Sequence, residues 1–512
     1  MERFDVVVLG AGFGGLGAAL RLAELGARVC VLERLSYPGG CASTFRRRGH
    51  AFESGATLFS GLGADELFGR WAREHAMPVQ FRTLDPVMEL RSPTGRLPVD
   101  HDRRRFWARL AEAPGAPAES LLAFANYQEQ VADSLWALFA RPDLLPPFDW
   151  RALLTHLGRL PDYRHLIPAL GRPLEAILRR FGLENYAPLR AYLDSTCQIT
   201  VQCSSAEAEA PLALAAMDYV FRGTGHVHGG IGELASGMVA AIRSLGGEVR
   251  FADRAMGLER SGDTWRVRSR RGEIESPHVV ANLLPKAILS LLEDTSPPRN
   301  LLRRSKRVRK GWGAAMIYAA IDPPEDAEPH HIDIVQDPSQ PYVEGNHIFV
   351  SVSGADETER APEHRRTVTV STHVDLEHLT QLPEAEQGPY IDAIHARMRD
   401  GLSRFVPELW DRRQLEMTAS PRTFERFTGR PDGFVGGIPR RAGLGTYFDL
   451  TAPEVLPGLH LVGDSVFPGQ STLATALGGV KVAEKLGKAL TARAPARPRP
   501  PLRAGTQSAP AD

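Results

Sequence analysis

The chain has 512 residues, several times the length of one ordinary domain, so we expect at least two folding units with ample buried core. Its 61 basic and 61 acidic side chains give a formal net charge of zero, which removes the global electrostatic attraction typical of nucleic-acid-binding proteins. The four cysteines, Cys30, Cys41, Cys197 and Cys203, lack Cys-x-x-Cys pairs and histidine partners at metal-ligand spacing. We therefore expect reduced thiols and no metal site.

The start of the chain runs directly into an apolar strand and a glycine-rich loop, without the basic, apolar and cleavage regions of a secretory signal. This pattern predicts a cytoplasmic protein. A membrane-spanning helix needs about 18 uncharged apolar residues. The nearest candidate, 210–221, is shorter and is interrupted by Asp218. Any membrane contact is therefore expected to be peripheral, on the inner face.

A dinucleotide-binding pattern follows the first predicted strand, 4–9, whose apolar and β-branched residues are typical of a buried parallel strand. Gly10, Gly12 and Gly15 have the Gly-x-Gly-x-x-Gly spacing and open a predicted helix, after which a second strand ends at Glu33. Gly10 permits the tight turn, Gly12 lets the backbone approach a pyrophosphate, and Gly15 allows close helix packing. The helix N-terminus offers free N–H groups to the phosphates. The complete strand–loop–helix–strand unit predicts a dinucleotide site.

The residues after the second strand extend this prediction. A carboxylate at Glu33 can accept hydrogen bonds from an adenosine ribose, and it argues against a 2′-phosphate on that ribose. Gly39 and Gly40, followed by Ser43 and Thr44, supply a second backbone approach to the same dinucleotide.

Two later segments carry related signals. Residues 226–285 predict a glycine-rich turn, a helix, a strand, a hairpin and the buried strand HVVAN, a pattern that returns the chain to the first sheet. Near the end of the chain, a short buried strand leads into Gly463 and Asp464, and a helix begins near Ser471 to Ala474.

Four stretches together resemble the phytoene desaturase and carotenoid isomerase family of FAD enzymes, with a carotenoid 3,4-desaturase-like character. They read GAGFGGLGAALRLAELGARVCVLERLSYPGGCASTF, HGGIGELASGMVAAIRSLGGEVR, PRTFERFTGRPDGFVGGIP and LVGDSVFPGQSTLATALGGVKVAE. Amine oxidases more often carry Arg after the paired glycines, where this chain has Cys41. The resemblance implies an α/β fold: a discontinuous, glutathione-reductase-like FAD-binding Rossmann domain with an inserted α+β substrate domain.

The resemblance also implies the cofactor contacts. Asp464 would bind the ribityl chain of the flavin, and the helix after Ser471 would point its positive end at the flavin ring. The residues expected to bind FAD are Gly10, Gly12, Phe13, Gly14, Gly15, Glu33, Arg34, Gly39, Gly40, Cys41, Ser43, Thr44, Gly463, Asp464, Ser471, Thr472 and Leu473.

The predicted domain boundaries follow these blocks. The FAD-binding part is expected to comprise residues 1–99, 225–294 and 415–490. The substrate part is expected to comprise a helical, membrane-facing segment, 100–224, and a sheet, 295–414. The Pro-, Ala- and Arg-rich end, 491–512, predicts a disordered tail.

The segment 151–180 contains six arginines interleaved with leucine and isoleucine. Such a basic amphipathic segment could rest on anionic lipid headgroups while its apolar side admits a lipid-soluble substrate. The alternative is an ordinary helical surface of a cytosolic protein.

We therefore predict an FAD-dependent oxidoreductase that places a long isoprenoid against flavin N5 and desaturates or cis–trans isomerises a carotenoid. The alternatives are an amine oxidase-like enzyme with a smaller substrate, and a non-catalytic prenyl-binding escort protein. No residue stands out as a catalytic acid or base. His226 and His228, beside the glycine-rich turn, are expected to be structural hydrogen-bonding residues rather than catalytic ones.

Overall fold

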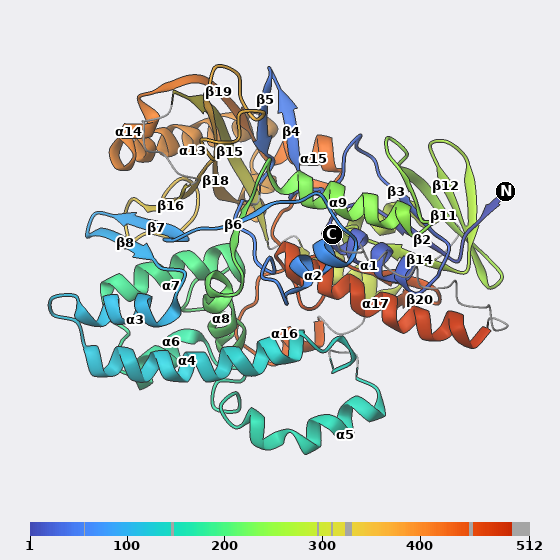
Figure 1. The fold of residues 1–512 in the computed structure, drawn as a ribbon, viewed down its shortest axis with the longest axis horizontal. Coiled ribbons are helices and arrows are strands. Elements are labelled where there is room, and N and C mark those ends of the chain that lie inside the picture. Colours follow the sequence, from blue (N-terminus) through green and yellow to red (C-terminus); the bar gives the residue numbers. More distant parts are fainter. Residues whose placement is uncertain are drawn as a thin grey trace, which may run out of the picture.

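The computed structural model describes residues 1–493 except 56, 145–147, 294–295, 309–310, 323–329 and 450–453. Most of the predicted disordered tail, from residue 494 onward, lies outside the described residues. Three larger β-sheets and a group of helices make up the described part (Figure 1).

The first sheet has six strands drawn from the start, middle and end of the chain. In spatial order they are β10 (Glu248–Arg250), β3 (Val29–Leu32), β2 (Val6–Leu9), β14 (His278–Ala281), β21 (Leu459–Leu461) and β20 (Glu454–Leu456). All neighbouring strands run parallel except β20, which is antiparallel to β21. The predicted discontinuous α/β Rossmann fold is therefore confirmed.

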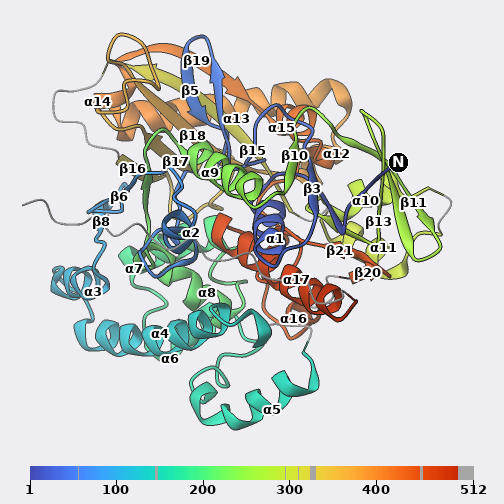
Figure 2. The same cartoon turned by 45° about the vertical axis from the view of Figure 1, so that its right-hand side comes forward.

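The two faces of this sheet are covered by different layers. Because side chains alternate along a strand, Val6 and Val8 of β2 pack against one layer, whereas Val7 and Leu9 pack against the other. The first layer comprises α1 (Phe13–Glu24), α9 (Ile231–Ser244) and α17 (Thr472–Arg493), which lie side by side in Figures 1 and 2. The second is a four-stranded sheet of β1 (Glu2–Arg3), β13 (Glu273–Ser276), β12 (Thr264–Ser269) and β11 (Ala255–Ser261). Both faces are apolar, which explains why β2 and β3 read as continuous hydrophobic runs.

The second large sheet has seven strands. Their order is β19 (Arg413–Ala419), β15 (Trp312–Ile321), β18 (Arg366–Asp375), β17 (His347–Val352), β16 (His330–Val335), β7 (Met88–Ser92) and β8 (Gly95–Val99). Helix α13 (Glu384–Phe405) covers one face through Ile394 and Met398, which pack with Ile317 and Val350. The opposite face is directed towards the cavity described below.

The predicted domain boundaries stay a prediction, but the sheets differ from them in one respect. Strands β7 and β8 fall within 1–99, which was predicted to belong to the FAD-binding part, yet β7 pairs with β16 of the seven-stranded sheet. A long-range strand pairing of this kind leaves no local signal in the sequence, because the pattern of an edge hairpin is the same in either sheet.

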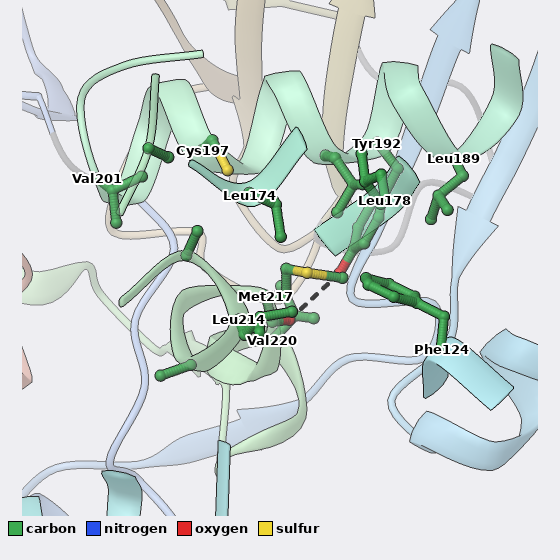
Figure 3. Close-up of a cluster of buried hydrophobic side chains, with 14 of the residues drawn as sticks. Phe124, Leu174, Leu178, Leu189, Tyr192, Cys197, Val201, Leu214, Met217 and Val220 are labelled. Carbon is green, nitrogen blue, oxygen red and sulfur yellow. Dashed lines mark hydrogen bonds between the residues drawn. The ribbon is translucent and has the colours of Figure 1, made fainter. Parts of the chain in front are cut away.

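Helices cover the lower part of the molecule in Figure 1. They are α3 (Arg103–Glu112), α4 (Ala118–Phe139), α5 (Trp150–Gly158), α6 (Leu174–Arg180), α7 (Ala187–Thr200) and α8 (Ala210–Met217). All except α5 pack around one hydrophobic cluster, which includes Phe124, Leu178, Tyr192 and Leu214 (Figure 3). Within the cluster the Tyr192 hydroxyl donates to the Met217 carbonyl at 3.3 Å, so its one polar group is satisfied.

Shorter elements connect these layers. They are the strands β4 (Thr44–Arg47), β5 (His50–Glu53), β6 (Phe81–Thr83) and β9 (Gly225–Val227), the helices α2 (Leu67–Glu74), α10 (Pro285–Leu291), α11 (Arg299–Val308), α12 (Leu376–Gln381), α14 (Pro407–Trp410), α15 (Pro421–Thr428) and α16 (Gly445–Asp449), and the 3₁₀ turns η1 (Pro142–Leu144), η2 (Leu160–Tyr163), η3 (Asp218–Phe221) and η4 (Pro431–Gly433). Across the described residues, no helix combines the length and the apolar character that crossing a membrane requires.

Candidate active site

A cavity of about 660 Å³ extends from the glycine loop before α1 to the seven-stranded sheet. Its lining comes from the loop 10–14, the start of α17, the helices α4, α7 and α8, and the strands β15, β17 and β18. The cavity therefore touches both large sheets and the helical part of the molecule.

The glycine loop is shaped by close backbone packing. Gly10 has φ +92°, a conformation that favours glycine. A Cβ atom on Gly12 would lie 2.6 Å from Nδ2 of Asn282, and one on Gly15 would lie 2.0 Å from the Gly10 carbonyl oxygen. Gly12 precedes α1 and provides no side-chain cap, so the first N–H groups of the helix remain available to a phosphate.

Glu33 holds the loop in place. Its Oε2 accepts a hydrogen bond from the Ala11 N–H at 2.7 Å, and its Oε1 accepts one from the Leu35 N–H at 2.7 Å. Burial raises the pKa of Glu33 above its usual range, although these two N–H groups act in the opposite direction. Glu33 and the neighbouring Arg34 both line the cavity, as expected for residues near an adenosine.

The paired glycines contact the same loop. The Gly39 N–H donates to the Ala11 carbonyl at 2.8 Å, and Gly39, Gly40 and Cys41 line the cavity. Ser43 and Thr44 are not among the lining residues. The Ser43 hydroxyl donates to the Gly40 carbonyl at 2.9 Å, and the Thr44 hydroxyl donates to Glu53 at 3.0 Å. Both side chains thus stabilise the turn into β4 and β5 rather than facing the cavity.

Asp464 follows Gly463, whose backbone lies beside Gly14 of the glycine loop. Its Oδ2 accepts a hydrogen bond from Nη2 of Arg430 at 2.6 Å, and Gly463 before it has φ +102°. Burial opposes the charge of Arg430, but Asp464 outweighs this effect and raises the pKa of the guanidinium. Burial also raises the pKa of the Cys41 thiol, which lies within electrostatic range of Arg430 and Asp464. Arg430 therefore brings a cation close to Cys41, the position at which amine oxidases more often carry Arg.

The N-terminus of α17 points into the cavity. Ser471, Thr472 and Leu473, three of the predicted cofactor residues, line it. The Ser471 hydroxyl accepts a hydrogen bond from the Ala474 N–H at 3.0 Å, and Ser471 itself has φ +95°, an uncommon value for a residue with a side chain. The 22-residue helix α17 thus directs the positive end of its dipole at the cavity.

Three further residues of the candidate site were missed by the sequence prediction. Asn282 follows β14 directly and packs on the glycine loop, a position that its place at the carboxyl end of a buried strand could have indicated. Arg430 and Arg440 also line the cavity, but nothing local in the sequence marks them. Burial lowers the pKa of Arg440 to about 10, against the opposing effect of Asp464.

The part of the cavity beyond α17 has mainly apolar walls. Trp136 and Phe139 of α4, Leu212 of α8, Met316 of β15 and Phe349 of β17 all line it. Among the described lining residues, the only carboxylates are those of Glu33 and Asp464, both on the dinucleotide side.

The two histidines beside the glycine-rich turn do not line this cavity. Nε2 of His226 lies 2.9 Å from Oε2 of Glu357, and both residues are buried. His228 lies 3.8 Å from Asp356 and from Glu359. These contacts support the expectation that both histidines are structural.

The described residues fit a dinucleotide cofactor. A side chain at Gly12 or Gly14 would fill space that lies against Asn282 and Gly463, so the glycines keep a cradle open where backbone N–H groups are exposed. Gly10, Gly12, Phe13, Gly14, Glu33 and Arg34 line one end of the cavity, and Gly463, Asp464 and the start of α17 line the next part.

Comparisons with known proteins agree with this arrangement. Residues 8–74 match the NAD(P)-binding Rossmann-like domain. Over 509 residues the chain is 27% identical to prolycopene isomerase 2, chloroplastic, of an Oncidium hybrid cultivar, covering 95% of this chain and 84% of that protein. It is 26% identical over 261 residues to the lycopene-forming phytoene desaturase of Pantoea ananas, covering 50% of each chain.

Among solved structures, a double mutant of putrescine oxidase with a redesigned cofactor site is 15% identical to this chain. The TM-score is 0.63, and the match covers 96% of this chain and 100% of that chain, which shows a shared fold. The Rossmann match and these relatives together point to a flavin cofactor. The chain is therefore similar, over nearly its whole length, to prolycopene isomerases and, over half of it, to a phytoene desaturase.

Proposed function

We propose that the protein is an FAD-dependent oxidoreductase that desaturates or cis–trans isomerises a long isoprenoid polyene. The observation that carries this proposal is the single cavity that joins the dinucleotide loop to a chamber with mainly apolar walls. The names of the relatives, prolycopene isomerase and phytoene desaturase, support the choice of substrate class.

FAD, when bound, supplies the acceptor or donor of an electron pair that these reactions need. Gly12 and the N-terminus of α1 would hold its pyrophosphate, Glu33 its adenosine ribose, and Asp464 its ribityl chain. The α17 N-terminus provides a positive potential beside the place where charge develops. The apolar walls orient the polyene and exclude water from it.

The amine oxidase alternative fits the cavity less well. A cationic amine needs a carboxylate in its pocket, since an unpaired buried charge is strongly unfavourable. Asp464 is paired with Arg430, and Glu33 lies at the dinucleotide end beside Arg34. Arg440, a further cation in the cavity lining, would repel an amine. The fold shared with putrescine oxidase is therefore compatible with a different substrate.

The escort-protein alternative does not account for the cofactor end. Gly10, Gly12 and Asp464 keep a dinucleotide cradle that a pure isoprenoid binder would not need. Replacement of Gly12 distinguishes a flavin enzyme from an escort protein, because an escort protein would keep isoprenoid binding without flavin.

We further propose that the protein takes its substrate from a membrane surface. Within 148–170, many large apolar side chains are exposed. They are Phe148, Trp150, Leu153, Leu154, Leu157, Leu160, Ile167 and Leu170, with exposed fractions between 41% and 65%. This exposed apolar surface is centred on α5, which projects from the rest of the molecule in Figures 1 and 2.

The surroundings of this surface favour a lipid bilayer with anionic headgroups as its partner. Arg151 and Arg164 are exposed in the same segment and can contact phosphates. A soluble protein rarely exposes so many large apolar side chains in one segment unless a partner or a membrane covers them. Helix α4 ends at Phe139, which lines the cavity, and η1 and α5 follow it along the chain, so the surface is close in sequence to the apolar chamber.

The proposal is tested by product analysis. FAD-loaded protein in liposomes is offered phytoene, poly-cis-lycopene and a hydroxylated acyclic carotenoid, under aerobic and reducing conditions. We expect either a longer chromophore formed only with an oxidant, which indicates desaturation, or a cis-to-trans change at constant mass, which indicates isomerisation. Unchanged carotenoids in every case, despite bound flavin, would contradict a carotenoid substrate.

A further inference from the structure

One wall of the substrate chamber is polar although its surroundings are apolar. Ser371 and His373 of β18 and His347 of β17 line the cavity on this wall, together with Thr200 at the end of α7. The wall is formed mainly by the face of the seven-stranded sheet opposite α13. A hydrocarbon has no group that could hydrogen-bond to these side chains.

The tautomer of His373 follows from its partner, Gln202. Nε2 of Gln202 lies 3.1 Å from the Gln198 carbonyl oxygen and 3.0 Å from the Ile199 carbonyl oxygen, so this atom must be the amide nitrogen. The same atom lies 3.3 Å from Nε2 of His373. An amide nitrogen donates and does not accept, so we assign Nε2 of His373 as the unprotonated ring nitrogen. The proton of the neutral ring is therefore on Nδ1.

His373 stays neutral over the physiological pH range. Burial, and to a lesser degree the neighbouring His347, lower the pKa of His373 to about 3. Within the described part of the chain, Nδ1 has no hydrogen-bond partner, and His373 is one of the residues that line the cavity. The ring is thus a fixed, uncharged hydrogen-bond donor whose natural partner is a neutral oxygen atom.

The neighbouring His347 is also held in place. Its Nε2 contacts Asp333, and the Ser195 hydroxyl donates to the second oxygen of the same buried carboxylate. Asp333 is completely buried behind His347, so its charge is directed at the histidine and the serine rather than at the cavity. The polar wall is therefore rigid and carries no free negative charge that would select a cation.

We propose that the substrate carries an oxygen atom, as a hydroxyl or carbonyl group, that accepts a hydrogen bond from His373. This inference rests on the proposed function and names a narrower substrate class within it, an oxygenated isoprenoid rather than a hydrocarbon. A hydrocarbon bound against His373 would cover the Nδ1–H without pairing it, which disfavours that ligand. Sites built to hydrogen-bond a substrate hydroxyl discriminate strongly against the analogue that lacks it.

The test compares two ligands that differ by one group: all-trans lycopene and the same chain with one terminal hydroxyl. Their affinities for the FAD-loaded full-length protein are measured by the change in flavin absorbance on binding, and kcat/KM is measured where turnover occurs. We expect the hydroxylated chain to bind at least tenfold more tightly. In His373→Leu this preference should disappear while lycopene binding is kept, and His373→Asn should retain part of it.

Met316→Leu is the matched control, because Met316 lines the same chamber from the adjacent strand β15 without a polar group. It should change the affinity for both ligands by the same factor. Equal affinities of the unmodified protein for the two ligands would overturn the inference. So would a His373→Leu variant that keeps the preference but has a shifted flavin spectrum, since His373 would then contact the cofactor.

The outcomes also separate this inference from the proposed function. Selective binding of the hydroxylated chain without turnover of either ligand would support the inference and count against the carotenoid reaction. Turnover of both ligands with equal kcat/KM and equal affinity would support the reaction and overturn the inference.

Discussion

At the scale of single residues, Gly12 and Arg440 are expected to act on the cofactor end of the cavity in two different ways. Gly12 acts through the space that it leaves free beside Asn282. Arg440 acts through charge: its Nη2 lies 3.5 Å from the Asp464 carbonyl oxygen, and its side chain packs on Gly469. The first effect concerns cofactor binding, and the second concerns the electronic state of the bound cofactor.

Replacement of Gly12 by valine should remove bound flavin. The Cβ atom alone would lie 2.6 Å from Asn282 Nδ2, and the additional methyl groups would occupy the approach of the pyrophosphate. The measurement is the flavin-to-protein ratio of the purified variant, with circular dichroism to verify folding. Gly388→Ala is the control, because a Cβ atom there has nothing within 4 Å, and it should keep full flavin content. Stoichiometric flavin in the folded Gly12→Val variant would refute the assignment.

Replacement of Arg440 by methionine should lower the reduction potential of the bound flavin. Reduction adds negative charge to the ring, and a buried cation near α17 favours that state. A tenfold loss of the preference for the reduced flavin corresponds to a shift of about 30 mV in the potential of a two-electron couple. A spectroelectrochemical titration measures the shift. Arg441→Met is the matched control, since Arg441 pairs with Glu207 at the surface and should leave the potential unchanged. An unaltered potential in Arg440→Met would contradict the electrostatic role.

At the scale of elements, α17 and α5 have opposite relations to the rest of the protein. Helix α17 packs against α1 on one face of the six-stranded sheet and directs its N-terminus at the cavity. Helix α5 buries little of its surface: within it, Ala152 is the one buried residue. A helix this short is not stable alone in water. The proposed contact with a bilayer would bury the apolar side chains that α5 leaves exposed.

The double change Leu154→Glu and Leu157→Glu should weaken binding to anionic vesicles at least tenfold. Each inserted leucine contributes about 1.5–3 kcal/mol, and the added charges would be repelled by the lipid. Vesicle flotation with phosphatidylserine-containing liposomes measures the bound fraction. Leu122→Glu serves as the control, because Leu122 is 47% exposed on α4, outside the 148–170 surface, and it should not change binding. Equal flotation of the double variant would exclude α5 as the contact.

At the scale of the whole molecule, the site exists only because distant parts of the chain meet. Strands β2, β14 and β21 lie side by side in one sheet, although they start at residues 6, 278 and 459. Their carboxyl ends carry Gly10, Asn282 and Gly463, which pack together at the dinucleotide loop. Ligands of open parallel sheets bind at these ends. The same assembly places the seven-stranded sheet across the cavity, so the cofactor end and the substrate end become one space.

The sequence by itself determined the features that depend on local patterns. The apolar strand, the Gly10–Gly12–Gly15 spacing and Glu33 predict the dinucleotide unit, because each needs only its neighbours along the chain. The cavity lining includes most of the predicted cofactor residues. Gly15 packs against Gly10 instead, and Ser43 and Thr44 face the β4–β5 turn.

Only the tertiary structure decided which distant side chains meet. The pairing of Arg430 with Asp464, the contact of Gln202 with His373, and the position of β7 beside β16 join residues separated by 34, 171 and more than 200 positions. Such contacts depend on how whole sheets and helices pack, and packing is not encoded in the periodicity of any one segment. The same reason applies to the exposed surface at α5: the sequence shows that its residues are apolar, but only the packing of the other helices leaves them uncovered.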